Sequence, residues 1–214
     1  EFLIKDQEAH DIFIPEDFSE EQLMMASATK EFVEKELDPH RERFEEKDYK
    51  LTEDCMKKAG ELGLVVSSLG NDDKFSSASF KNIIDTCPDT QIVIEHLAGV
   101  GMNEPPYNAY KSALECAQRP NTTIKIPGLG EITPRPTTLR PEFGFENVPP
   151  LFEMAYEAFG PDRMMWGSDY PPSAGREGYR NTLEGVRNHP VFAKDDDIDW
   201  VLGKTAARIW KFND

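Results

Sequence analysis

Hydrophobic residues recur with a helical period in the first part of the chain. One stripe follows a potential capping box formed by Ser19 and Gln22, and it stops at Pro39. A second stripe follows the potential N-cap Thr52 and stops at Gly63, a residue type that often ends helices. We therefore predict two amphipathic helices. Their apolar positions are Leu23, Ala26, Val33 and Leu37 in the first, and Cys55, Met56, Ala59 and Leu62 in the second.

From about residue 80 onward, short apolar runs alternate with helical stripes. Three runs have the length of strands, at residues 91–96, 123–126 and 164–166. Alternation of strands and helices is typical of βαβ units and a parallel sheet, so we predict three βα units. Residues 67–79 are small and polar, which is typical of a linker. The helical stripes lie at residues 80–87, 110–117, 151–159, 179–186 and 198–209.

Two of the predicted strands end at residues with useful chemistry. His96 ends the first strand, and Asp169 follows the third after only Gly167 and Ser168. In parallel α/β folds the carboxyl ends of strands face the ligand. An imidazole can bind a metal or take a proton, and a carboxylate can bind a divalent ion or orient a water molecule. Two structural alternatives stay open: Asp169 as a turn cap, and His96 as a hydrogen-bonded core residue.

The charge of the chain bears on its partners. Asp and Glu number 40 against 24 Lys and Arg, which gives a formal net charge of −16. Nucleic acids and anionic membranes both need basic surfaces, so we expect neither as a partner. No apolar run approaches the roughly 20 residues of a membrane span, and no basic-then-apolar signal sequence is present. We expect a soluble, cytoplasmic protein.

The first part of the chain resembles the opening of an acyl-CoA dehydrogenase. The resemblance covers residues 1–66 and implies an N-terminal helical domain that forms one wall of an acyl-CoA and FAD site. The family's β-domain, flavin-binding segments and catalytic glutamate have no counterpart here, so this chain alone cannot complete such an enzyme. The segments that carry the resemblance are residues 1–5, 12–15, 18–22, 32–39 and 58–64.

The remainder resembles the last part of an amidohydrolase-related TIM barrel. The resemblance covers residues 80–212 and keeps the order of the elements. It implies strands six to eight of the barrel and a group of enzymes that contains metal-dependent hydrolases of lactones and amides as well as some decarboxylases. The segments that carry it are residues 88–99, 124–129, 160–171 and 202–210.

This second resemblance implies roles for individual residues. His96 matches the histidine after the sixth strand, which activates water or contacts substrate. Asp169 matches the aspartate after the eighth strand, a metal ligand or general base, with zinc or manganese as the expected ion. Four further residues are expected to line the substrate pocket: Lys125, Gly128, Ser168 and Tyr170.

Important parts of the barrel pattern are missing. The family's first strand supplies a His-x-His pair and its fifth strand another histidine, yet no His-x-His occurs in this sequence. Residues 80–214 are also too few for a closed barrel, which takes about 250 residues. We therefore expect an α/β fold with a partial barrel of strands six to eight at residues 80–214, a linker at 67–79, and an all-α segment at 1–66.

Three functional hypotheses follow. The first is a metal-dependent hydrolase or decarboxylase that acts on a small organic acid, lactone or amide. It would be incomplete or inactive as this chain alone, with a partner chain or a second copy covering the open barrel edge. The second is a fragment of an FAD-dependent acyl-CoA dehydrogenase. The third is a non-catalytic interaction chain, a chimera of two incomplete families.

Overall fold

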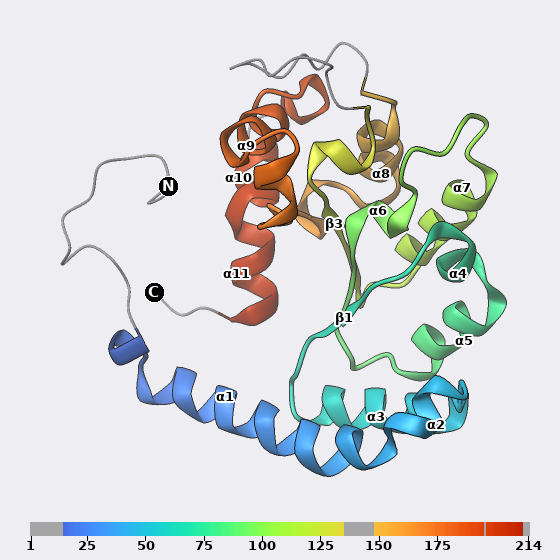
Figure 1. Cartoon of the computed structure of the whole chain (residues 1–214), viewed down its shortest axis with the longest axis vertical. Coiled ribbons are helices and arrows are strands. Elements are labelled where there is room, and N and C mark those ends of the chain that lie inside the picture. The colour runs from blue at the N-terminus through green and yellow to red at the C-terminus, as the bar shows by residue number, and fades with distance from the viewer. Residues whose placement is uncertain (1–14, 135–147, 195, 212–214) are drawn as a thin grey trace. The chain divides into compact units, whose positions relative to one another are not determined.

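The computed structural model describes residues 15–134, 148–194 and 196–211 (Figure 1). The chain divides into two compact units, Glu1–Ala59 and Gly60–Asp214. Each unit is described by itself.

In the first unit, helix α1 (Glu20–Phe32) begins at the predicted capping box. The Gln22 amide donates to Ser19 Oγ over 3.2 Å, and the Ser19 amide donates to Gln22 Oε1 over 2.8 Å. A π-helical turn, Val33–Leu37, and a 3₁₀ turn, Asp38–His40, continue the helical path through Pro39. The predicted start of this helix is confirmed, because it depends on a local capping signal. The predicted stop at Pro39 is wrong, since a further helix begins directly after the 3₁₀ turn at Arg41.

Two more helices follow in sequence, α2 (Arg41–Glu45) and α3 (Tyr49–Glu61). The predicted N-cap of α3 at Thr52 is wrong, since the helix begins three residues earlier. The carboxylate of Asp48 accepts a hydrogen bond from the Leu51 amide over 3.0 Å, and it therefore takes the capping role. The predicted stop is confirmed: Gly63 has a φ of 68°, a left-handed conformation that glycine adopts without strain.

The second unit is built on a parallel sheet of four strands in chain order, β1-β2-β3-β4. Strands β2 to β4 are almost completely buried, as expected of a parallel sheet covered on both faces. Figure 1 shows β1 and β3 in the middle of this unit, with α4, α5 and α7 on one side and α9, α10 and α11 on the other. The strands are β1 (Val66–Ser68), β2 (Ile92–Ile94), β3 (Thr122–Ile126) and β4 (Met164–Trp166).

The helices of this unit lie between and after the strands. They are α4 (Asp72–Ser76), α5 (Ala78–Thr86), α6 (His96–Gly99), α7 (Asn108–Leu114), α8 (Leu151–Phe159), α9 (Tyr179–Arg187), α10 (Asp197–Asp199) and α11 (Thr205–Trp210). The apolar core gathers on the strands and on α7 and α8, where Tyr110 and Phe152 are fully buried.

The prediction of three strands is wrong by one. Strand β1 pairs with β2 through Val66 and Ile92, and together with α4 it takes up part of the segment 67–79 that we expected to be a linker. Two of the three residues of β1 are serines, and the short apolar run at residues 64–66 ends at the first residue of the strand. Its structure comes from pairing with a buried neighbouring strand.

Candidate functional site

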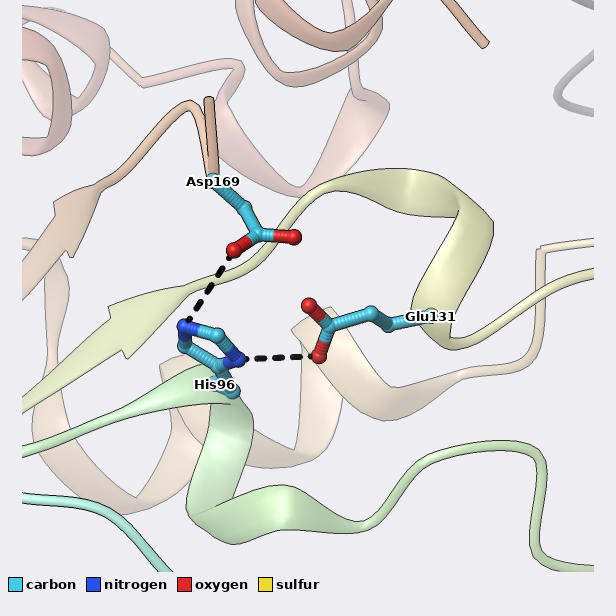
Figure 2. A group of neighbouring side chains, drawn as sticks. All are labelled: His96, Glu131 and Asp169. Carbon is cyan, nitrogen blue, oxygen red and sulfur yellow. Dashed lines mark hydrogen bonds and ion pairs between the residues drawn. The ribbon is translucent and has the colours of Figure 1, made fainter. Parts of the chain in front are cut away.

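Three side chains converge beyond the carboxyl ends of β2, β3 and β4. His96 follows β2, Glu131 lies in the 3₁₀ turn Leu129–Glu131 after β3, and Asp169 follows β4. Figure 2 shows the three side chains pointing toward one another, with dashed lines that join the imidazole of His96 to each of the two carboxyl groups. His96 Nδ1 lies 3.0 Å from Glu131 Oε2, and His96 Nε2 lies 3.9 Å from Asp169 Oδ1. Since parallel strands end at one edge of a sheet, residues far apart in sequence meet here.

The backbone of this site is strained. Four consecutive residues, His96 to Gly99, have positive φ angles of 53°, 48°, 56° and 63°, so α6 is a left-handed turn. Asp169 also has a positive φ, 49°. Each left-handed residue other than glycine costs about 1–2 kcal/mol. Strain of this kind concentrates at functional sites, and here it lies at both of the predicted catalytic residues.

Gly99 makes the left-handed turn possible. A Cβ atom at this position would lie only 1.9 Å from the carbonyl oxygen of Gly70. The close approach of the two backbones therefore requires glycine. At this close approach, the turn that carries His96 packs against the loop after β1, the strand that was not predicted from the sequence.

Sequence reasoning did not identify Glu131. Its amide donates to the Gly128 carbonyl over 3.0 Å, which directs the turn back toward His96. The available signal was its position, since it is an acidic residue shortly after Pro127 and Gly128 end the second predicted strand. The residues given roles from the sequence lie on a predicted strand or within four residues of its end, and Glu131 lies one residue further.

Arg176 is a second residue that sequence reasoning did not identify. Its Nη2 donates to Asp169 Oδ2, and its Nη1 lies 3.6 Å from Glu131 Oε1. Behind it lies the fully buried carboxylate of Glu177, with Oε2 3.5 Å from Arg176 Nε and Oε1 accepting from Thr182. The site therefore combines one imidazole, one guanidinium and three carboxyl groups.

Burial and mutual contact shift the pKa values of these groups. The hydrogen bond with Glu131 raises the pKa of His96, against the effect of burial. Burial opposes ionisation of Glu131, but the hydrogen bonds with His96 and Asp169, together with the charges of His96 and Arg176, outweigh it and lower the pKa of Glu131. Burial and the neighbouring Glu131 raise the pKa of Asp169, opposed by Arg176. Near neutral pH, Glu131 is therefore an ionised acceptor, and His96 Nδ1 donates to it.

The predicted substrate-binding residues lie in different surroundings. Lys125 forms an ion pair with buried Glu95 over 2.6 Å, and Glu95 Oε2 lies 3.8 Å from His96 Nε2. Gly128 is buried beside Arg176, and a Cβ there would lie 2.6 Å from Arg176 Nη2. The structure therefore brings Lys125 and Gly128 to the cluster.

The other two predicted pocket residues flank Asp169. Ser168 Oγ accepts a hydrogen bond from the Tyr170 amide over 3.3 Å. The Tyr170 side chain is exposed. Their roles in substrate binding stay predictions.

The donor set suits a divalent metal. Among residues 15–134, 148–194 and 196–211, His96, Glu131 and Asp169 form the one group of three His, Cys, Asp or Glu residues whose ligand atoms lie within 4.8 Å of one another. Three protein ligands with nitrogen and oxygen donors match catalytic zinc sites, in which the remaining position holds water or substrate. The residues present therefore fit a zinc or manganese ion.

Comparison with known proteins gives the family. The model of the amidohydrolase family matches residues 14–212, nearly the whole chain. This chain belongs to the amidohydrolase family. The predicted resemblance to this family is confirmed, and the match also includes most of the segment that we compared with acyl-CoA dehydrogenases.

Solved structures show the same fold. An amidohydrolase from Burkholderia multivorans, solved with HEPES and also with zinc, has a TM-score of 0.65 at 19% and 20% identity; the match covers 76% of this chain and 58% of that one. A Pseudomonas putida protein assigned as a 2-pyrone-4,6-dicarboxylic acid hydrolase has a TM-score of 0.56 at 17% identity, covering 74% and 55%. The amidohydrolase chain described here thus spans little more than half the length of these proteins.

One curated relative is named as a different class of enzyme, an acyl-CoA dehydrogenase. A probable acyl-CoA dehydrogenase of Bacillus subtilis is 35% identical over 83 residues, which are 36% of this chain and 14% of the relative. An uncharacterised protein of Sinorhizobium fredii is 35% identical over 86 residues, 39% of this chain and 26% of the relative. The relation to dehydrogenases rests on the one partial match to the Bacillus protein, so it stays a prediction together with the chimera. Among the described helices, none has the length and apolarity to cross a membrane.

Proposed function

We propose that this amidohydrolase chain carries the metal centre of a hydrolase that acts on a small organic acid, lactone or amide. The observation that supports this proposal is the convergence of His96, Glu131 and Asp169 at one edge of the parallel sheet. The zinc-bound Burkholderia amidohydrolase agrees with a metal in this fold, and the Pseudomonas protein's assignment agrees with hydrolysis.

His96, Glu131 and Asp169 would hold the ion. Glu131 accepts from His96 Nδ1, which fixes the ring tautomer and leaves the Nε2 lone pair directed toward Asp169 Oδ1. When bound, a divalent metal polarises a carbonyl oxygen and lowers the pKa of a water molecule. Asp169 is placed to accept a proton at Oδ1, the oxygen that Arg176 leaves unbonded.

Decarboxylation is the alternative reaction within the same family. It needs the same positioning of a carboxylated substrate but no attacking water. The two reactions are distinguished by their products, since only decarboxylation releases carbon dioxide. The assignment of the Pseudomonas neighbour favours hydrolysis.

We propose further that the barrel around this site is complete only with additional strands. A closed (β/α) barrel has eight parallel strands, whereas the described residues form four. Each of the outer strands, β1 and β4, pairs with a single neighbour within the described residues. A partner chain or a second copy that covers these edges would bury their free backbone groups.

Metal analysis tests the metal centre. We expect the purified chain to retain about one zinc or manganese ion after dialysis. Asp169→Asn should abolish this retention, whereas Asp162→Asn, which alters a carboxylate half-exposed beside Arg208, should not. Retention of metal by Asp169→Asn, or no retention by the unmodified chain, would contradict the proposal.

The partial match to a dehydrogenase supports a second candidate, a fragment that associates with an FAD-dependent acyl-CoA dehydrogenase. It predicts flavin absorbance in the purified protein or stable association with a flavoprotein. Absence of both would exclude it. A chain that binds neither metal nor flavin would agree with the third hypothesis, a non-catalytic interaction chain.

A further inference from the structure

Arg176 lies among the carboxylates of the site and faces little solvent. Its side chain is only 12% exposed. The guanidinium bonds to Asp169, and further carboxylate oxygens lie 3.5 Å (Glu177) and 3.6 Å (Glu131) from it. A guanidinium so placed neutralises negative charge inside the site, and it favours the ionised forms of Asp169 and Glu131.

The loop after β3 leaves space for the guanidinium of Arg176. A Cβ atom at Gly128 would lie 2.6 Å from Arg176 Nη2, and one at Gly130 would lie 3.2 Å from Arg176 Cβ. Both glycines are buried. Side chains at these two positions would push Arg176 out of the cluster, so the loop maintains the position of the charge.

The balance between the carboxylates and the guanidinium indicates the role of Arg176 in the metal-free site. Asp169, Glu131 and Glu177 can carry three negative charges, and Arg176 supplies one fixed positive charge among them. A divalent ion held by His96, Glu131 and Asp169 would share the Asp169 carboxylate with Arg176. The ion would bring a second positive charge next to the guanidinium, and like charges at such distances repel strongly in a half-buried site.

We propose that Arg176 is the internal counter-ion of the metal centre. It holds Asp169 and Glu131 together while no metal is bound, and it weakens the affinity of the site for divalent ions. Metal uptake is therefore a competition between the ion and the guanidinium for Asp169. This inference rests on the proposed metal centre at His96, Glu131 and Asp169.

Zinc titration of the full chain against a chromophoric chelator tests this role. Arg176→Met removes the charge, and we expect it to bind zinc at least about tenfold more tightly than the unmodified chain. Arg176→Lys keeps the charge and should stay within about threefold of the unmodified chain. The control is Arg119→Met, which breaks a bidentate pair with Asp85 at 2.6 and 2.7 Å and should leave zinc affinity unchanged.

A second measurement separates this role from simple packing. The metal-free Arg176→Met variant should melt at a lower temperature than the unmodified chain, because its carboxylates repel one another, and zinc should restore most of the loss. If Arg176→Met does not fold, Arg176→Gln takes its place, because glutamine keeps hydrogen-bond donors without the charge. We then expect from Arg176→Gln the same tighter zinc binding and the same lower melting temperature without metal.

The outcomes are distinguishable. If zinc binding depends on Asp169 but is equal or weaker in Arg176→Met, the counter-ion role is overturned and the metal centre stands. If neither the unmodified chain nor Arg176→Met binds zinc, the metal centre fails and the counter-ion role fails with it.

Discussion

The helices of the first unit and the strand ends of the second unit differ in what determines their structure. Helix α1 begins at its own capping box, and none of its residues is buried. Strand β2, in contrast, is completely buried, and the left-handed turn His96–Gly99 that comes shortly after it packs at Gly99 against the distant Gly70. Local signals thus shape one region, and contacts between distant segments shape the other. Changes in the second region should have much larger effects.

The largest effect is expected from Gly99→Ala. The added Cβ would overlap the Gly70 carbonyl oxygen at 1.9 Å and would also occupy a left-handed backbone. We expect the free energy of unfolding of the second unit to fall by about 3 kcal/mol or more. Chemical denaturation followed by tryptophan fluorescence measures it.

Gly101→Ala is the matched control for this change. Gly101 has a similar φ of 58°, but an added Cβ would meet nothing within 4 Å. It should therefore cost only the left-handed conformation, about 1–2 kcal/mol. Equal losses in the two variants would show that the contact with Gly70 does not hold the turn.

Glu131→Gln should have the next largest effect. The amide keeps the shape of the side chain but loses the charge that supports His96 and a bound ion. We expect zinc affinity to fall by about 10–100-fold. Glu115→Gln, which alters an acid paired with Lys81 away from the site, should bind zinc normally. Unchanged affinity in Glu131→Gln would remove this residue from the centre.

The pH dependence of stability distinguishes two half-buried histidines, His96 and His189. The folded state raises the pKa of His96, so its protonation stabilises the metal-free chain fully below the unfolded pKa of about 6.5, and this contribution is lost as pH rises through the folded pKa. Burial lowers the pKa of His189, which should destabilise the folded chain as pH falls below about 6.5.

Stability curves in the presence of a chelator measure this difference. The loss caused by His96→Asn should be larger at pH 5.5 than at pH 8, which lie about one unit below and about 1.5 units above the unfolded pKa of about 6.5. His189→Asn should show the opposite trend. If the loss of stability changes with pH in the same direction in both variants, the assignment of the Glu131 hydrogen bond to His96 is contradicted.

The smallest effect is expected in the first unit. Ser19→Ala removes one capping interaction and should destabilise α1 by about 1 kcal/mol, measured by hydrogen exchange in its first turn. Met24→Gln, at a side chain that is 67% exposed, should change stability by less than about 0.5 kcal/mol. A large loss in Met24→Gln would show that this face has a partner and would weaken the contrast between the two regions.

The contrast also explains which features could be predicted from the sequence. The start of helix α1 was predicted because its cap is local. His96 and Asp169 were predicted because each lies at or shortly after the end of an apolar run, and the family resemblance supplied their roles. Glu131 and Arg176 were not predicted, because a turn and a loop bring them back to the strand ends, and the periodicity of the sequence carries no signal for such loops. Strand β1 was missed because its apolar run, residues 64–66, lies mostly before the strand, which continues into serines.

The central claim is that His96, Glu131 and Asp169 form one metal centre. Anomalous diffraction from a zinc-soaked crystal of the full chain tests it most directly. The account predicts a zinc peak in contact with all three side chains, at about 2.0–2.2 Å from the donor atoms. A zinc peak bound elsewhere, or a peak that contacts Asp169 without His96 and Glu131, would contradict it.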